Sequence, residues 1–189
     1  GAHRRGKLPG DGTGQVKTGI ETLEHRNFGP VAVVWRPGPR VVRVFLSRPG
    51  LSGTEAASTV FPGAAQGSCR EVDRLVRNMR AFLEGEPVTF SLELADMDGL
   101  GEFRKSVLLE EYGVPRGKTT TYGGLARRLS TGPRAVGNAL AGNPFPVIIP
   151  CHRAVRSDGF PGEYQGGRAM QRALLELEGV RFDGRGRAS

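Results

Sequence analysis

The sequence predicts an α+β fold built from two domains. Between residues 18 and 95, short apolar runs typical of β-strands surround one strongly amphipathic helix, which indicates a small α/β domain with a β-sheet. Residues 95–99 (ADMDG) then interrupt the pattern and are interpreted as a linker. From residue 100 to 182 short helical segments dominate, which indicates a helical C-terminal domain. A chain of 189 residues is long enough for two small domains.

Four strands are expected in the N-terminal domain. The first three lie at residues 18–25 (TGIETLEH), 31–35 (VAVVW) and 41–47 (VVRVFLS), and the WRPGPR segment supplies Pro and Gly for the turn between the second and the third. The fourth is expected at residues 87–94 (PVTFSLEL), where every second position is apolar: Val88, Phe90, Leu92 and Leu94.

An amphipathic helix is expected between the third and fourth strands. Ser68 and Glu71 have the spacing of a capping box, and Gly85 is placed to end the helix. Cys69 falls at the start of this helix and is interpreted as structural. One face of the helix is apolar: Val72, Leu75, Val76, Met79, Phe82 and Leu83.

Two short helices in the C-terminal domain, at residues 122–129 and 133–141, are joined by a turn that contains glycine, which is the helix-turn-helix signature. Val136 and Leu140 are expected to face the core. The outward face then carries small residues and a single large one, Arg134. Such a face can approach a DNA duplex closely and insert one arginine. Alternatively, its small residues let the helix pack against another helix.

The remaining elements complete a winged helix-turn-helix domain. A helix marked by Phe103, Val107 and Leu108 comes first, and the residues 148–153 (IIPCHR) are expected to form a strand. Turn signals at residues 158–162 predict a hairpin or wing. A last helix follows Gly166-Gly167 and ends at Glu178-Gly179, with an apolar face: Met170, Ala173, Leu174 and Leu177.

Both ends of the chain are expected to be disordered. Residues 1–17 and 183–187 are rich in glycine and charged side chains. The N-terminal segment has no apolar core of the kind found in signal peptides, and no apolar stretch is long enough to cross a bilayer. We therefore expect no membrane association.

The charge balance favours a nucleic-acid partner. The formal net charge is +8, and the 27 basic residues comprise 23 arginines and four lysines. Arginine suits bidentate contacts with phosphate and stacking on bases. The alternative explanation is a GC-rich genome, which favours arginine codons.

The stretch IIPCHRAV raises the question of a reactive cysteine. Cys151 is followed directly by His152 and Arg153, and nearby positive charge is expected to lower the pKa of a thiol. The alternative is a buried structural cysteine beside an unrelated histidine. The only other cysteine is Cys69, and the three histidines have no zinc-binding spacing, so no metal is expected. Reduced thiols in the cytoplasm are the simpler interpretation.

Several blocks of the C-terminal domain resemble one known family. The blocks are VPRGKTTTYGGLA (114–126), RAVGNALAGNP (134–144), IIPCHRAV (148–155), GEYQGG (162–167) and LLELEG (174–179). In this order and spacing they resemble the O6-alkylguanine-DNA alkyltransferases, also called methylated-DNA–protein-cysteine methyltransferases. The resemblance covers roughly residues 100–180, and the N-terminal half matches only in general layout.

The resemblance implies direct-reversal DNA repair, in which the alkyl group of O6-alkylguanine is transferred irreversibly to Cys151 in a single turnover. It implies that His152 takes the thiol proton through a bound water and that Glu178 orients His152. Asn143 would brace the loop that carries the cysteine, and Tyr122 would donate a hydrogen bond to a ring nitrogen of the flipped guanine. As neighbours on a strand, Cys151 and His152 are expected to point to opposite faces, which favours a water between them.

The resemblance also implies a DNA interface and a pocket. Arg134 would fill the gap left by the rotated nucleotide, and the side of the site that faces DNA would include Ala135, Gly137 and Tyr122. The alkyl pocket would be lined by the segment Tyr164, Gln165 and Gly166. Four departures from the family pattern bear on the alkyl groups accepted: Ala154 for Val, Gln171 for Lys, Val107-Leu108 for Val-Trp, and a bulky Gln165.

Three alternatives are weighed against this interpretation. An alkyltransferase-like protein would bind the damaged base without transfer, but such proteins replace the cysteine. A winged-helix regulator would read bases with polar side chains, and a cysteine hydrolase would need an oxyanion hole. The expected partner is double-stranded DNA containing O6-alkylguanine, without a small-molecule cofactor. We expect a monomer in the cytoplasm, associated with the nucleoid if the organism is prokaryotic, and leave clustering on DNA open.

Overall fold

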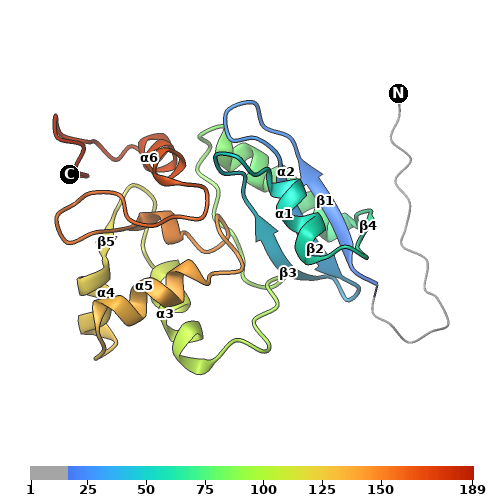
Figure 1. Ribbon diagram of the computed structural model, residues 1–189, viewed down its shortest axis with the longest axis horizontal. Helices are drawn as coiled ribbons and strands as arrows, with labels where there is room; N and C mark the ends of the chain where they lie inside the picture. Colours follow the sequence, from blue (N-terminus) through green and yellow to red (C-terminus); the bar gives the residue numbers. More distant parts are fainter. Residues whose placement is uncertain (1–16) are drawn as a thin grey trace.

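The computed structural model describes residues 17–189 and places a sheet domain beside a helical domain (Figure 1). The disorder expected over residues 1–17 concerns, apart from Lys17, residues outside that range. The largest buried apolar cluster runs through both domains, from Leu23 to Leu174. The boundary expected at residues 95–99 is therefore crossed by a continuous core. No helix among the described residues is long and apolar enough to span a membrane.

A four-stranded sheet in the order β3-β2-β1-β4 forms the N-terminal domain. The expected strands appear as β1 (Gly19–Leu23), β2 (Val31–Arg36) and β3 (Arg40–Phe45), which pair antiparallel. The short β4 (Ala65–Gln66), which was not expected, pairs parallel to β1.

Both faces of β2 are covered, which explains its unbroken apolar run. Alternate side chains enter two different clusters, because successive residues of a strand point to opposite faces. Ala32 and Val34 pack with Ala57 of helix α1 (Gly53–Val60), whereas Val31 and Val33 join the large cluster.

Helix α1 was not expected from the sequence, and the capping box belongs to it. Ser52 Oγ accepts the backbone N–H of Glu55, and the Glu55 carboxylate accepts the N–H of Ser52. The capping box expected at Ser68 is wrong: Cys69 is the N-cap of α2 (Arg70–Leu83) and makes no side-chain cap. Ser68 Oγ instead donates to the carbonyl of Cys69. The apolar face expected for α2 is confirmed.

The strand expected at residues 87–94 is wrong, since the segment forms no ladder. Its backbone pairing with β3 is limited, within the described residues, to the Val41 N–H that donates to Leu94, and Val41 also bridges to Ala95 just beyond the segment. Farther along the same edge, Val44 donates to the carbonyl of Pro144, a residue of the C-terminal domain. The edge that a fourth strand would need is thus shared with another segment.

The C-terminal domain contains the expected helix-turn-helix. Helix α3 (Glu102–Tyr112) packs against α4 (Tyr122–Arg128) and α5 (Pro133–Ala141), and the last helix, α6 (Arg168–Leu177), lies beside the turn that carries Cys151. Val136 and Leu140 are buried, as expected. Thr120–Thr121 (β5) pairs parallel with Ala154–Val155 (β6). The expected wing is a tight hairpin in which Arg156 donates to Phe160.

Two other expectations are corrected here. The IIPCHR segment is not a strand: Cys151–Arg153 form a 3-10 turn that leads into β6. The tail at residues 183–187 is ordered, because Asp183 accepts two backbone N–H groups and the Arg187 guanidinium, and Phe182 and Ala188 pack against a small cluster around Leu175.

Candidate active site

The Cys151 turn is held by Asn143, at the end of α5. The buried Asn143 side chain donates to the carbonyl of Ile149 (3.2 Å) and accepts the N–H of Phe145 (2.9 Å), so it ties together both ends of the loop before the cysteine. Val147 within this loop has a φ of 74°, a strained conformation for a β-branched residue. The predicted bracing role of Asn143 is consistent with this geometry.

The Cys151 thiol is buried and not activated by its basic neighbours. Its residue is 7% exposed. Burial raises the pKa of the Cys151 thiol to about 12, and a hydrogen bond with Asn143 offsets only part of the rise. The expectation that adjacent positive charge lowers this pKa is wrong, because the Arg153 guanidinium is bound to Glu178 instead. The thiol is therefore protonated at neutral pH and requires a base.

His152, the next residue, has a ring nitrogen that can accept a proton. Its ring is fully buried, and Nε2 lies 2.8 Å from Oε1 of Glu178. Burial lowers the pKa of His152, although the hydrogen bond to Glu178 opposes this. A neutral ring that donates from Nε2 carries its lone pair on Nδ1. Nδ1 has no hydrogen-bond partner among the described residues, so it is available to accept a proton.

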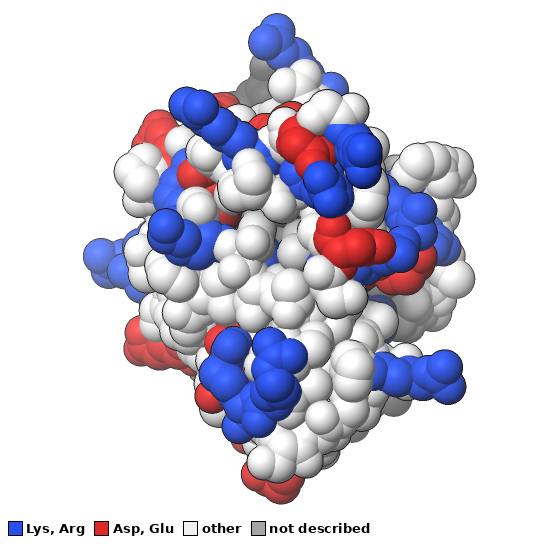
Figure 2. All heavy atoms as spheres, turned by 90° about the vertical axis from the view of Figure 1, so that its left-hand side faces the viewer, with Lys and Arg blue, Asp and Glu red and all other residues white. Residues whose placement is uncertain are grey.

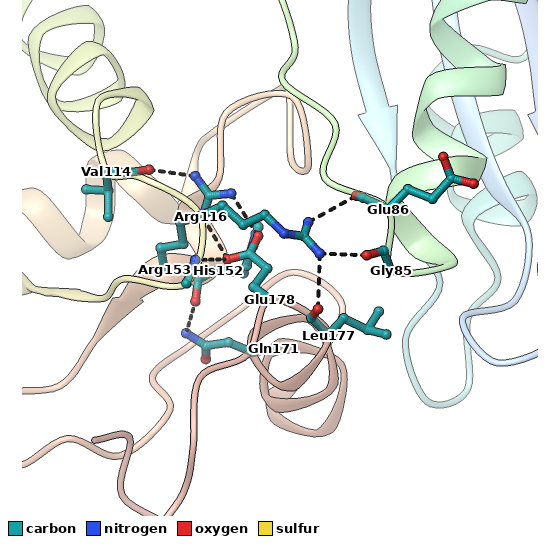
Figure 3. A network of polar contacts seen from close by, with 10 residues as sticks. Gly85, Glu86, Val114, Arg116, His152, Arg153, Gln171, Leu177 and Glu178 are labelled. Carbon is teal, nitrogen blue, oxygen red and sulfur yellow. Dashed lines mark hydrogen bonds and ion pairs between the residues drawn. The ribbon is translucent and has the colours of Figure 1, made fainter.

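Glu178 binds two neighbouring side chains at once (Figure 3). Arg153 donates from Nε to Oε2 (2.9 Å) and from Nη2 to Oε1 (2.8 Å), and the backbone N–H of Gly117 lies 3.4 Å from Oε2. Burial opposes ionisation, but the hydrogen bonds from His152 and Arg153 outweigh it and lower the pKa of Glu178 to about 2. The carboxylate is therefore charged when it receives the His152 N–H.

Gln171 is a site residue whose role the sequence did not reveal. It was predicted only as the loss of a charge. The structure shows it buried on α6, where Nε2 donates to the carbonyls of His152 (3.1 Å) and Ala154 (2.8 Å). Gln171 thus holds the backbone that follows Cys151, whereas Asn143 holds the backbone that precedes it.

Tyr122 and Tyr164 flank the thiol. Burial, with the charge of a Cys151 thiolate as a second cause, raises the pKa of Tyr122 to about 12, so its hydroxyl remains a donor. A Cβ on Gly162 would collide with that hydroxyl, which explains a glycine there. The Tyr164 ring lies 6.3 Å from that of His152, and its buried hydroxyl has no partner among the described residues.

The other predicted pocket residues continue from Tyr164. Gln165 donates its side-chain N–H to the carbonyl of Asn143, so its bulk is turned toward the backbone of the cysteine loop. Gly166 is buried, and a Cβ there would overlap the Met170 side chain.

The helix-turn-helix presents α5 at the surface. Arg134 is exposed in the first turn, and Ala135 and Gly137 are half-buried on the same helix. A Cβ on Gly137 would meet nothing within 4 Å, which means that this part of the helix is open to a partner. On the side of the molecule that carries α4 and the C-terminus, groups of Lys and Arg border a broad uncharged area (Figure 2).

One buried acid has no predicted role. Glu111 of α3 is fully buried, and neither carboxylate oxygen has a hydrogen-bond partner among the described residues. Burial raises the pKa of Glu111 to about 8, although Arg153 and Arg128 lower it in part. Within residues 17–189 no group of three His, Cys, Asp or Glu side chains is placed to hold a metal ion.

Comparison with known proteins places this geometry in a family. The family model described as "6-O-methylguanine DNA methyltransferase, DNA binding domain" matches residues 102–180. The methylated-DNA–protein-cysteine methyltransferase of Thermococcus gammatolerans is 33% identical over 168 residues, a match that covers 72% of this chain and 96% of that protein. The chain belongs to the methylated-DNA–protein-cysteine methyltransferase family.

Another relative and a solved structure are also similar to this chain. The methylated-DNA–protein-cysteine methyltransferase of Methanothermobacter thermautotrophicus is 44% identical over 113 residues, a match that spans 60% of this chain and 64% of the relative. The structure of Mycobacterium tuberculosis OGT in complex with DNA is 27% identical, with a TM-score of 0.66, over 85% of this chain and 92% of that one.

Proposed function

We propose that this protein repairs O6-alkylguanine in double-stranded DNA by moving the alkyl group to its own Cys151. The proposal rests on one arrangement: the buried Cys151 thiol and the His152 ring lie in the same turn. The His152 Nε2 atom bonds to Glu178, and its Nδ1 atom has no partner among the described residues. Membership of the methyltransferase family supports the same assignment.

The chemistry is a single in-line displacement. The Cys151 sulfur attacks the alkyl carbon, the S–C bond forms, and the bond from that carbon to the guanine oxygen breaks. The thiol proton passes through a water to Nδ1 of His152, and Glu178 stabilises the cation that forms, as the third member of a hydrolytic triad does. A thioether has no route back to the thiol, so each molecule acts once.

Tyr122 assists the departing base. Its hydroxyl keeps its proton at neutral pH because its pKa is raised to about 12. It can therefore donate to a ring nitrogen of the guanine, which leaves as a neutral base with the electrons of the broken bond; solvent then reprotonates the tyrosine. Tyr164 and Gly166 line the side of the pocket where the alkyl group would lie.

The base must leave the duplex to reach the thiol, because the target atom is inaccessible in the stack. Extrusion costs a few kcal/mol, and an inserted side chain offsets part of that cost. Arg134, exposed at the start of α5, is the side chain that we assign to this role. The DNA complex of a relative supports DNA as the partner.

We propose that the protein acts as a monomer in a reducing compartment. Cys69 and Cys151 are both free thiols. Free thiols suit the cytoplasm.

Intact-mass spectrometry tests the proposal. The protein is mixed with a duplex that carries one O6-methylguanine, beside an unmethylated duplex as control. We expect a mass increase of one CH2 group that maps to Cys151 and saturates at one per molecule. In Cys151→Ser we expect no increase but retained duplex binding. Binding without any mass change in the unmutated protein would identify a damage-binding protein instead.

A further inference from the structure

The Arg116 side chain joins the two domains directly behind the proposed site (Figure 3). Its guanidinium donates to the carbonyls of Gly85 (2.8 Å) and Glu86 (3.1 Å), just after the end of α2, and to the carbonyl of Leu177 (3.0 Å), the last residue of α6. Leu177 has one of the last carbonyls of α6, which lack partners within the helix and carry partial negative charge. One cation therefore joins the segment that follows α2 in the N-terminal domain to the end of α6 in the C-terminal domain.

The same junction reaches the His152 ring through Phe82. Phe82 belongs to α2 in the N-terminal domain and is almost completely buried. Its ring meets the His152 ring edge to face, with centroids 5.8 Å apart at an angle of 61°. The Arg116 guanidinium also lies over the Phe82 ring, 5.9 Å from its centre. The imidazole thus rests against a side chain of the other domain.

Glu178 is held by the loop that carries Arg116. Arg116 binds the carbonyl of Leu177, the residue before Glu178. The backbone N–H of Gly117 donates to the Glu178 carboxylate. Gly117 has a φ of 76°, and a Cβ there would lie 3.0 Å from the Glu178 carbonyl oxygen. Residues 116 and 117 therefore fix both the backbone and the side chain of Glu178.

We propose that Arg116 and Phe82 are positioning residues for alkyl transfer, through which the N-terminal domain holds the His152–Glu178 pair in the geometry that accepts the Cys151 proton. This inference rests on the function proposed above. Proton transfer requires the acceptor atom within hydrogen-bond reach, directly or through one water. Without the Phe82 ring, the His152 ring loses a packing contact. Without Arg116, the end of α6 next to Glu178 loses a hydrogen bond. In either case Nδ1 of His152 is no longer held at the position that accepts the proton.

The test compares single-turnover rates of methyl transfer from duplex DNA across a range of pH. Phe82→Leu and Arg116→Ala are the variants, and Arg116→Lys tests whether charge alone is sufficient. Arg172→Ala is the matched control, since Arg172 is also stacked over an aromatic ring, Phe182 (4.6 Å), but lies outside the site.

Near neutral pH we expect a loss of about tenfold to a hundredfold in Phe82→Leu and Arg116→Ala, the size expected when a base is misplaced. The loss should shrink at alkaline pH, where hydroxide removes the thiol proton directly. Affinity for the duplex and the rate of the Arg172→Ala control should not change. Arg116→Lys should restore part of the rate, because a lysine reaches fewer carbonyls.

The charged and titratable groups around the pair also affect the pH profile: Glu178 just after α6, Arg153 and Cys151 in the turn, Arg116 in its loop, Tyr164 in the pocket segment and Glu111 on α3. None of these except Arg116 differs between the proteins compared. A loss of the same factor at every pH, or no loss, would overturn the inference. If Arg116→Ala does not fold, Phe82→Leu and Arg116→Lys decide the question.

Nitrogen-15 spectra of His152 separate this inference from the proposed function. The unmutated protein should show a neutral ring with its proton on Nε2, and Phe82→Leu should shift or broaden those signals. An unchanged His152 spectrum in both Phe82→Leu and Arg116→Ala contradicts the positioning role. Absence of methyl transfer in the unmutated protein contradicts the proposed function, whatever the spectra show.

Discussion

Arg153 donates two hydrogen bonds to the Glu178 carboxylate, from Nε to Oε2 (2.9 Å) and from Nη2 to Oε1 (2.8 Å). The third residue of the Cys-His-Arg turn therefore serves the carboxylate and not the thiol that precedes it. Arg153 also donates from Nη1 to the carbonyl of Val114, so its position is fixed at both ends. With His152 on the same carboxylate, two neighbours along the chain meet on the residue that caps the C-terminal end of α6.

This relationship predicts the effect of Glu178→Gln. Removal of one partner leaves the nearly buried Arg153 cation uncompensated, so we expect the free energy of unfolding to fall by about 3–5 kcal/mol. Because folding lowers the pKa of Glu178 to about 2, its ionic contribution is complete above the unfolded pKa near 4.5 and disappears as the pH falls toward 2. Denaturant unfolding at several pH values should show a smaller acid-induced loss in the variant.

Glu176→Gln is the control for that measurement. Glu176 also pairs with an arginine, Arg172, but at the surface. Its replacement should change stability by less than about 1 kcal/mol. Equal effects of the two substitutions would show that the Arg153–Glu178 pair is not a special contact.

Arg134→Ala should weaken repair of duplex DNA more than reaction with free O6-alkylguanine base. The free base needs no extrusion, whereas the duplex loses the side chain that fills the gap. Single-turnover rates on both substrates measure the difference. Arg77→Ala on the exposed face of α2 is a matched control that should leave both rates unchanged. Equal losses of Arg134→Ala on the two substrates would remove Arg134 from this role.

Glu111→Gln should make stability less dependent on pH between about pH 4.5 and pH 8. Folding raises the pKa of Glu111 from 4.5 to about 8. Between these two values the unfolded chain is ionised and the folded one is not, so stability falls as the pH rises, by up to about 1.4 kcal/mol for each pH unit. The variant should lack this decline, and thermal unfolding from acid to alkaline pH measures it. Glu110→Gln, at a neighbouring exposed site, should retain it.

Gln171→Leu should loosen the turn without touching the thiol. It removes both hydrogen bonds from Nε2 and leaves the carbonyls of His152 and Ala154 without that donor. We expect a loss of about 1–3 kcal/mol in unfolding free energy and a slower methyl transfer. Gln66→Leu, an exposed replacement in β4, should do neither. An active and fully stable Gln171→Leu protein would refute the assignment.

Local patterns were sufficient to predict most helices and strands. The three main strands and helices α2 to α6 follow from apolar periodicity, which a strand or helix needs wherever one face is buried. The capping box shows the limit: Ser52 and Ser68 each precede a glutamate by three residues, and only the first forms the bonds. The strand predicted at residues 87–94 has the correct alternation but lacks a free sheet edge.

The candidate site residues could be predicted because they lie together in recognisable blocks of the sequence. Cys151, His152 and Asn143 could be identified as site residues from two short sequence blocks, residues 134–144 and 148–155. Phe82, Arg116 and Gln171 could not, since the roles proposed for them depend on contacts between segments far apart in the chain. Phe82 meets a histidine 70 positions later, and the hydrogen bonds of Arg116 within the described residues go to backbone carbonyls. A backbone partner leaves no mark in the partner's residue type.

The burial of Cys151 has a consequence for how long the protein stays usable. Peroxides and small electrophiles react with thiolates and not with thiols. A thiol with a pKa near 12 is almost wholly in its unreactive form in the resting protein. If each molecule reacts only once, as proposed, the protonated thiol protects it from inactivation by ordinary cellular oxidants and alkylating agents. In the proposed mechanism, the thiol becomes a nucleophile only when a flipped guanine lies next to it and His152 takes its proton.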